Sequence, residues 1–348
     1  MKTATFEIID VWEPDETYTN HRIPGMIVTD KGTLLIYCEA RRTASDWAKM
    51  DILLKRSEDN GKSFVDAVAL AEGTDEHKTV NNPVMMQDKN GRIHFLYCED
   101  YTVNGGRVIR RYSDDDGISW SEPVDITAMT WPEYHNAFAL GPGHGITTDD
   151  GVLIVPVWMV PKDRQAPLFD HAPSVVTTLY SKDNGESWTL GELLEDTETV
   201  KNPNETQAAV TSDGRIYLNL RMHGICRAKA YSENGHSGWT DYSADEQLPD
   251  PRCFGSVVSY ADKEHPYTLL FVNCASTEKR SCVTVRASVD DGKSFAYSRL
   301  IDGERGGYTE IAADSKAGII YVLYENDWGV TEHLARFNYE WITEGDGH

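Results

Sequence analysis

Five segments of the chain contain, between them, arginine, acidic and tyrosine side chains, whose chemistries are complementary. A guanidinium group presents a planar fork of N–H donors that binds a carboxylate through two hydrogen bonds. Aspartate and glutamate transfer protons, and a tyrosine becomes a nucleophile when a base takes its proton. The segments lie far apart in the sequence, so they form one site only if the fold brings them together. They are HRIPGM (21–26), EARRTASDWAKMDILLKRSEDNG (39–61), NETQAAVTSDGRIYLNLR (204–221), KRSCVTVRASVDDGKSF (279–295) and GGYTEIAADSKAGIIYVLYE (306–325).

Patterns for a metal or a nucleotide cofactor are missing from the sequence. The six cysteines and 11 histidines show no spacing typical of a zinc site. The stretch GPGHG at residues 141–145 is rich in glycine, but it lacks the strand-to-helix context of a dinucleotide-binding motif. We therefore expect chemistry that uses neither a metal nor a cofactor.

One short motif, Ser-x-Asp-x-Gly followed by an aromatic residue, recurs along the chain. In a tight turn the Asp accepts hydrogen bonds from backbone N–H groups, and the Gly supplies a positive φ. The motif therefore predicts the tip of a β-hairpin, with the aromatic ring packed between neighbouring units. A fifth copy is degenerate, with Asn234 where Asp is expected and His236 where Gly is expected. The copies are RSEDNGKSF (56–64), YSDDDGISW (112–120), YSKDNGESW (180–188), YSENGHSGW (231–239) and ASVDDGKSF (287–295).

The segments that flank these motifs are typical of short β-strands, as in MDILLKRS, SVVTTLYS and CVTVRAS. The first serines of the motifs stand at 57, 113, 181, 232 and 288, so the mean spacing of about 58 divides 348 residues into six units. We predict an all-β chain that forms a single six-bladed β-propeller over residues 1–348, because blades arranged in a ring protect their sheet edges. The N-terminal strand TATFEIIDVW would close the last blade against the C-terminal strands. A two-sheet sandwich with coincidental hairpins is the alternative, and it leaves the repeat unexplained.

Composition and charge narrow the classes of partner. Hydrophobic residues make up 40% of the chain, enough for a sizeable core. The formal net charge of −23 argues against a nucleic-acid partner, although a local arginine cluster can still dominate one pocket because charge is screened beyond about 8–10 Å. No signal peptide or membrane span is visible, so we expect a cytoplasmic protein without a membrane partner, whose cysteines are reduced core thiols. The sequence does not define its oligomeric state.

The order of the motifs resembles the exo-sialidases (neuraminidases) of the bacterial type, over nearly the whole chain. That family shows an Arg-Ile-Pro motif, Asp-box hairpins, Asn-Glu, Leu-Asn-x-Arg, a third arginine before a Thr-Val-Arg strand, and a late tyrosine. Asp-boxes alone are common to many unrelated propellers, so the ordered arginine, glutamate and tyrosine set is the more specific part. The resemblance implies a glycoside hydrolase whose partner is a sialylated oligosaccharide or a free sialoside.

The resemblance assigns an arginine triad to Arg22, Arg221 and Arg280, which would grip the carboxylate of the sugar. It assigns the nucleophile to Tyr308 and the base that activates it to Glu205. A neutral phenol avoids the repulsion that a carboxylate nucleophile would meet beside the substrate carboxylate. Each residue taken alone also has an ordinary explanation: a surface arginine, a tyrosine packed in a blade, or a solvated glutamate.

The remaining assignments concern the acid/base and the supporting residues. Asp46, in the sequence SDW, matches the acid/base loop of the family, whereas its rival Asp51 lies inside a predicted strand and is expected to be structural. Arg41 would face the sugar oxygens, and Glu325 would pair with Arg22, although both could be part of the scaffold. Lys49 stands where relatives often carry an acidic residue, which leaves the specificity of that rim open.

We therefore predict a retaining exo-α-sialidase, or a relative acting on a similar keto-sugar acid, that works through a tyrosyl–glycoside intermediate. A catalytically silent carbohydrate-binding propeller is the alternative, and it would keep the arginines but misplace Asp46 or Tyr308. A protein-interaction propeller would need none of these residues. Linkage preference, and the balance of hydrolysis and transfer, are not encoded in recognisable motifs.

Overall fold

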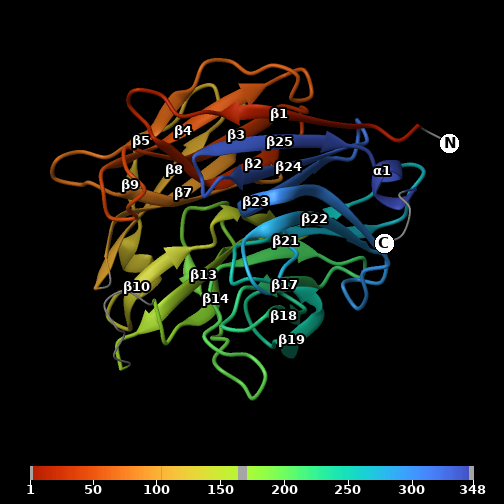
Figure 1. The fold of residues 1–348 in the computed structure, drawn as a ribbon. Helices are drawn as coiled ribbons and strands as arrows, with labels where there is room; N and C mark the ends of the chain where they lie inside the picture. The colour runs from red at the N-terminus through yellow and green to blue at the C-terminus, as the bar shows by residue number, and fades with distance from the viewer. Residues whose placement is uncertain (1–2, 103, 164–170, 345–348) are drawn as a thin grey trace.

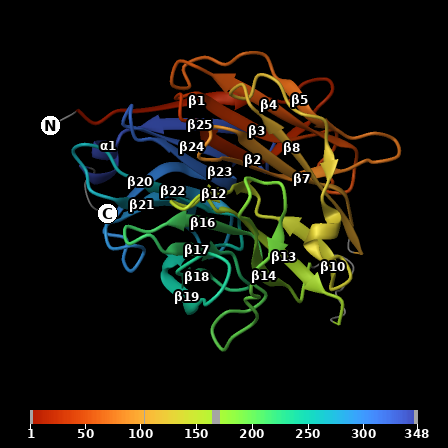
Figure 2. The same cartoon turned by 180° about the vertical axis from the view of Figure 1, so that it is seen from behind.

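Six four-stranded antiparallel blades form a ring in the computed structural model, which describes residues 3–102, 104–163 and 171–344. The colour gradient runs once around the molecule, so the blades follow one another in sequence order (Figure 1 and, from behind, Figure 2). The prediction of a six-bladed β-propeller is confirmed. Among the described residues, no helix combines the length and the apolar character that a membrane crossing requires.

The first four blades are continuous in sequence. Blade 1 contains β2 (Asn20–Val28), β3 (Leu34–Arg41), β4 (Met50–Ser57) and β5 (Val68–Glu72). Blade 2 contains β6 (Val80–Gln87), β7 (Ile93–Thr102), β8 (Gly105–Ser113) and β9 (Val124–Asp125). Blade 3 contains β10 (His135–Leu140), β13 (Leu153–Pro161), β14 (Val175–Ser181) and β15 (Thr189–Leu190). Blade 4 contains β16 (Thr206–Val210), β17 (Ile216–Leu220), β18 (Cys226–Ser232) and β19 (Thr240–Pro249).

Blades 5 and 6 share one long strand, β23 (Tyr297–Asp314). Its first half pairs with β22 (Ser281–Ser288) and completes blade 5, which also contains β20 (Ser256–Tyr260) and β21 (Thr268–Cys274). Its second half pairs with β24 (Ile319–Asn326) and is the innermost strand of blade 6. The outer strands of blade 6 are β25 (Thr331–Phe337) and β1 (Phe6–Trp12), which pair antiparallel from Phe6 opposite Phe337 (Figure 1). Strands from both ends of the chain therefore share one sheet.

Short elements complete the described structure. They are the 3₁₀ helix η1 (Thr127–Thr130), the strands β11 (Gly143–His144) and β12 (Ile146–Thr147), and the helix α1 (Tyr339–Thr343). The apolar cores lie between blades: β3 is buried along its whole length, and Tyr37 and Leu35 of blade 1 share a cluster with Phe95 and Met85 of blade 2. The cysteines are free thiols, as predicted, and Cys38, Cys98, Cys253 and Cys274 are buried.

The Asp-boxes form the hairpins between the third and fourth strands of blades 1 to 5. In the third box, Asp183 accepts hydrogen bonds from the Ser187 N–H (2.9 Å), the Ser187 hydroxyl (2.5 Å) and the Ser181 hydroxyl (2.8 Å). Gly185 has φ 81°, and a side chain there would collide with His94 of the preceding blade. The motif therefore closes a turn and also packs one blade against the next.

The degenerate fourth box corrects one detail of the sequence analysis. Its turn is one residue shorter, because the Gly235 N–H, rather than that of His236, donates to the Ser232 hydroxyl at 3.0 Å. Gly235 has φ 73°, and Asn234 accepts from the Ser237 N–H as an aspartate would. The box is therefore still a closed turn, with its glycine moved by one position.

We expect Asp183→Ala to lower the free energy of unfolding by about 1–3 kcal/mol, because the turn loses its hydrogen-bond acceptor. Turnover should change little, since the box lies away from the cleft described below. Asp183→Asn should cost less, because Asn234 already serves in the fourth box. Denaturant unfolding and initial-rate assays would check this. A variant that loses turnover while keeping its stability would contradict a structural role.

Candidate active site

The predicted site residues gather at one end of the ring of blades. Because strands alternate in direction, the starts of the first strands and the hairpins between second and third strands share one end. The Asp-box hairpins lie at the opposite end. A cleft of about 220 Å³ opens at the first end. Seven of the eight predicted residues line it: Arg22, Arg41, Asp46, Glu205, Arg221, Arg280 and Tyr308.

The three arginines of the predicted triad surround Tyr308. The guanidinium carbons of Arg22 and Arg280 each lie 5.3 Å from the centre of the Tyr308 ring. Arg221 donates a hydrogen bond to the phenol oxygen at 3.0 Å. Blades 1, 4, 5 and 6 contribute these four side chains, so their convergence depends on closure of the ring. The arrangement can bind a carboxylate directly above a phenol.

Tyr308 and Glu205 form a buried hydrogen-bonded pair. The phenol donates to the Glu205 carboxylate at 2.5 Å, and Arg221 also donates to that carboxylate at 2.5 Å. Burial raises the pKa of Tyr308 well above its ordinary value; the charge of Glu205 raises it further, and the arginines offset only part of the rise. The phenol is therefore neutral at neutral pH and already aligned with a base.

Glu325, the eighth predicted residue, lies beneath the cleft and is almost fully buried. Its carboxylate binds Arg22 Nε at 3.1 Å and accepts the backbone N–H groups of Ile23 and Tyr308 at 3.0 Å each. Burial opposes its charge, but Arg22 and the two N–H groups outweigh burial and keep its pKa below the ordinary value. One carboxylate therefore positions both an arginine of the triad and the Tyr308 backbone.

Asp46 lies in the β3–β4 loop at the mouth of the cleft, with its side chain 53% exposed. Its carboxylate binds Arg41 Nη1 at 2.5 Å and lies 3.7 Å from Arg22 Nη1. Burial raises the pKa of Asp46, but Arg41 and Arg22 together lower it by more, so the net shift is downward. The group is therefore ionised at neutral pH, and its protonation depends on the charges of Arg41 and Arg22.

Arg41 is itself held by Glu39, which sequence analysis missed. Glu39 is buried, binds Arg41 Nε at 2.9 Å and accepts the Asn82 N–H at 2.8 Å. Burial raises the pKa of Glu39, and Arg41 offsets part of that rise. Glu39 and Arg41 are two positions apart on one strand and so point to the same side, a signal that alternation along CEAR contained.

Asp51 and Lys49 lie outside the residues that line the cleft. Asp51 is buried and accepts hydrogen bonds from the Tyr18 hydroxyl (2.5 Å), Arg42 (2.7 Å) and the Gly73 N–H (2.9 Å). These contacts tie together blade 1 and the segment that precedes it. Lys49 pairs with Asp75 at 3.3 Å, and both side chains are exposed.

An aromatic wall on the side of blades 1 to 3 is the second feature that sequence analysis missed. Tyr101, Trp158 and His171 line the cleft, and the Tyr101 and Trp158 rings meet edge to face at 6.3 Å. Trp47 stacks on Tyr101 at 5.5 Å. The wall combines residues from three blades, and no sequence motif marks such a contact. It adds aromatic surface to the side of the cleft formed by blades 2 and 3.

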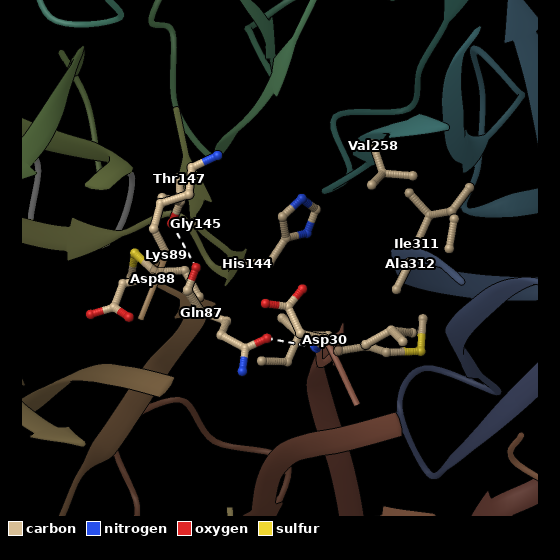
Figure 3. Close-up of a pocket in the computed structure, with 15 residues that line it drawn as sticks. Asp30, Gln87, Asp88, Lys89, His144, Gly145, Thr147, Val258, Ile311 and Ala312 are labelled. Carbon is tan, nitrogen blue, oxygen red and sulfur yellow. Dashed lines mark hydrogen bonds between the residues drawn. The ribbon is translucent and has the colours of Figure 1, made fainter. Parts of the chain in front are cut away.

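A second hollow, of about 360 Å³, lies at the other end of the ring, and Figure 3 shows the residues that line it. His144 projects into it, and its Nδ1 binds the buried carboxylate of Glu310. Among the described residues that line this hollow, none is an arginine or a tyrosine. It therefore lacks the arginine cluster and the phenol that the first cleft combines.

Fold and cleft together define a propeller glycosidase with an arginine-lined pocket, and comparisons with known proteins agree. Residues 66–322 match the BNR repeat-like domain family. The chain is 29% identical to an exo-alpha-sialidase of Arthroderma benhamiae over 98% of the chain and 90% of that protein. It is 27% identical to a sialidase of Bacteroides fragilis over 90% of the chain and 61% of that protein.

Solved structures give the same result. The Hadza microbial sialidase Hz136 superimposes with a TM-score of 0.84 at 26% identity, over 94% of this chain and 67% of that one. A leech intramolecular trans-sialidase superimposes with a TM-score of 0.81 at 16% identity, over 99% of this chain and 71% of that one, and so shares the fold. The chain belongs to the BNR-repeat, bacterial-type exo-sialidase family, and it is a glycoside hydrolase.

Proposed function

We propose that this chain is a retaining exo-α-sialidase that removes terminal sialic acid from glycosides through a covalent intermediate on Tyr308. The observation that carries the proposal is the Tyr308–Glu205 pair beneath three converging arginines, with Asp46 at the mouth of the same cleft. The relatives named as exo-sialidases support the substrate class. The proposed partner is a sialylated oligosaccharide or a free sialoside.

Binding begins with the sugar carboxylate, which Arg22, Arg221 and Arg280 hold by charge-assisted hydrogen bonds. The anomeric carbon, which bears that carboxylate, then lies above the phenol. The apolar faces of Tyr101 and Trp158 suit the methyl group of an N-acyl substituent on the sugar ring. A keto-sugar acid without that group would lose this contact and keep the arginines.

The first chemical step forms a bond from the Tyr308 oxygen to the anomeric carbon and breaks the glycosidic C–O bond. Glu205 takes the phenol proton, and Asp46 gives a proton to the leaving oxygen. The bound carboxylate offsets the charge of Arg22, so the pKa of Asp46 rises when substrate binds and the group can be protonated. Substrate binding thus favours the protonated form of Asp46, the form that can donate a proton.

The second step reverses these roles. Asp46, now a carboxylate, takes a proton from water, and the water oxygen attacks the anomeric carbon. The bond to Tyr308 breaks, and Glu205 returns its proton to the phenolate. Net retention of configuration follows from two displacements at the same carbon. The silent carbohydrate-binding alternative would not need Asp46 and Tyr308 in one cleft.

The test is the turnover of an aryl α-ketoside of N-acetylneuraminate by the wild-type protein and by Arg280→Ala. We expect wild-type turnover, and a fall in kcat/KM of about a hundredfold in the variant, because the buried carboxylate loses a charged partner. Arg92→Ala is the matched control, since Arg92 binds the surface residue Asp114 at the Asp-box end. No turnover by the wild type would refute the proposed activity. Unchanged kinetics in Arg280→Ala would refute the role of the triad.

A further inference from the structure

The glycine-rich stretch GPGHG at residues 141–145, the axial segment, lies at the centre of the ring of blades. It follows β10 of blade 3, and within it β11 pairs with β6 of blade 2. The Tyr37 hydroxyl of blade 1 donates to the Gly143 carbonyl at 2.6 Å, and the Gly141 carbonyl accepts the Thr206 N–H of blade 4 at 3.3 Å. Only a segment at the centre of the ring can contact strands of so many blades.

His144 links the axial segment to blade 6. Its side chain, labelled in Figure 3, is buried, and its Nδ1 binds the fully buried carboxylate of Glu310 on β23. The Ser256 hydroxyl of blade 5 donates to the same carboxylate at 2.9 Å. Burial raises the pKa of Glu310, and His144 and Ser256 offset part of the rise. A buried polar pair therefore connects the centre of the ring to the strand of Tyr308.

The axial segment also contacts the strands of the proposed nucleophile and base directly behind these two residues. Glu310 follows Tyr308 by two positions, and Gln207 follows Glu205 by two positions. Residues two apart on a strand point to the same side and lie about 7 Å apart. Gln207 Nε2 donates to the Pro142 carbonyl, while Glu310 binds His144 of the same segment. The segment therefore bridges the two strands one step below the Tyr308–Glu205 hydrogen bond.

Gly143 fits closely between the two bridging side chains. Its φ is 92°, a conformation that favours glycine. A side-chain carbon at this position would overlap the Glu310 carboxylate and would lie 2.8 Å from Gln207 Nε2. The absence of a side chain therefore lets the segment pass between Glu310 and Gln207.

We infer that His144 is a positioning residue, which holds the proposed nucleophile at hydrogen-bonding distance from its base. The inference rests on the proposed function, in which Tyr308 attacks while Glu205 takes its proton. Blades 4 and 6 share no sheet, so the separation of these two side chains depends on contacts across the centre of the ring. Arg221 binds both side chains on the cleft side, and the axial segment joins their strands from below.

The test follows labelling of Tyr308 by an excess of a 3-fluoro-sialosyl fluoride, measuring both its rate and its final extent per chain. We expect His144→Ala to lower the labelling rate and kcat by about tenfold, because a small misalignment of the reacting groups slows the first displacement. The label should still reach one per chain, and KM should stay within about twofold of the wild type. His144→Asn should recover most of the rate, since its amide nitrogen can take the place of Nδ1.

Gln207→Met tests the other end of the bridge, because it removes the donor to Pro142 and keeps the length of the side chain. It should also slow labelling without lowering its final extent. His94→Ala is the matched control, since His94 is a fully buried histidine that binds Asp88 at 3.1 Å in blade 2. It should lower the melting temperature and leave the labelling rate unchanged.

The outcomes separate the inference from the proposed function. A wild type that shows neither turnover nor label would refute the proposed function. A labelled wild type, with His144→Ala and Gln207→Met labelled equally fast, would overturn the inference. So would a lower final extent at an unchanged rate, because that result shows a loss of folded protein and no misalignment. If His144→Ala does not fold, His144→Asn and Gln207→Met decide the question: wild-type labelling rates in Gln207→Met would overturn the inference.

Discussion

Tyr308→Phe is expected to lower kcat by about a thousandfold or more on any sialoside, because the proposed nucleophile loses its oxygen. Affinity for the sugar carboxylate should persist, because the arginines keep contacts that do not involve the Tyr308 hydroxyl. Arg22 and Arg280 contact the Tyr308 ring, and Arg221 binds the Glu205 carboxylate. The measurement is steady-state kinetics, combined with the affinity for a 2,3-unsaturated sialic acid that cannot react.

A covalent probe tests the assignment of the nucleophile at the level of a single residue. A 3-fluoro-sialosyl fluoride should label the wild-type protein at Tyr308, because the ring fluorine slows both displacements while the fluoride leaving group lets the first proceed. Tyr308→Phe should take up no label. Tyr324→Phe is the control, since Tyr324 is a buried tyrosine of the same blade whose hydroxyl binds Asp302 at 3.0 Å. An adduct that mass spectrometry places on any other residue would overturn the assignment.

Asp46→Asn is expected to slow the cleavage of some substrates much more than others, according to their leaving groups. Cleavage of sialyllactose should fall by about 10²–10⁴-fold, because a sugar alkoxide needs a proton as it leaves. A nitrophenyl ketoside should be affected much less in the step that breaks its glycosidic bond, because nitrophenolate leaves without a proton. Single-turnover kinetics on both substrates would isolate this step.

Asp51→Asn provides the comparison within the same blade. Asp51 has no contact with the cleft and binds Tyr18 and Arg42, so its replacement should lower stability and leave the ratio of the two rates unchanged. If Asp46→Asn slowed both substrates equally, Asp46 would be acting through Arg41 and Arg22, and proton donation would have to come from another group.

Repetition made the fold predictable from sequence, because five copies of one turn motif define both the hairpins and the spacing of the blades. The strand β23 was not predictable in the same way. Its two halves pair with β22 and β24, and Gly303, Gly306 and Gly307 at the change of partner are more typical of a turn between two strands than of one continuous strand. The shortened turn of the fourth box was also missed, because a shift of one residue only becomes visible when Gly235 is seen to donate to Ser232.

The residues of the cleft also divide into those that the sequence predicted and those that it did not. Ordered motifs pointed to Arg22, Arg221, Arg280, Glu205 and Tyr308, and the structure brings these side chains together; their catalytic roles stay predictions. The pairing of Glu39 with Arg41 could have been predicted from the alternation of side chains along a strand. Two other contacts could not have been predicted from sequence, that of Tyr101 with Trp158 and that of Trp328 with Arg305. Each joins segments whose proximity depends on how the chain folds in three dimensions.

The pairing of β1 with β25 has a consequence for the order in which this molecule can mature during synthesis. Residues 6–12 leave the ribosome more than 300 residues before their partners at 331–337. Until then β1 lacks β25, the strand it pairs with, and contacts of such sequence separation form slowly. Glu325 also belongs to blade 6, so Arg22 and Tyr308 are held in place only after residue 325 has been made. The nascent protein should therefore be inactive and open to strand exchange until its final strands emerge, and it should become competent in one late step.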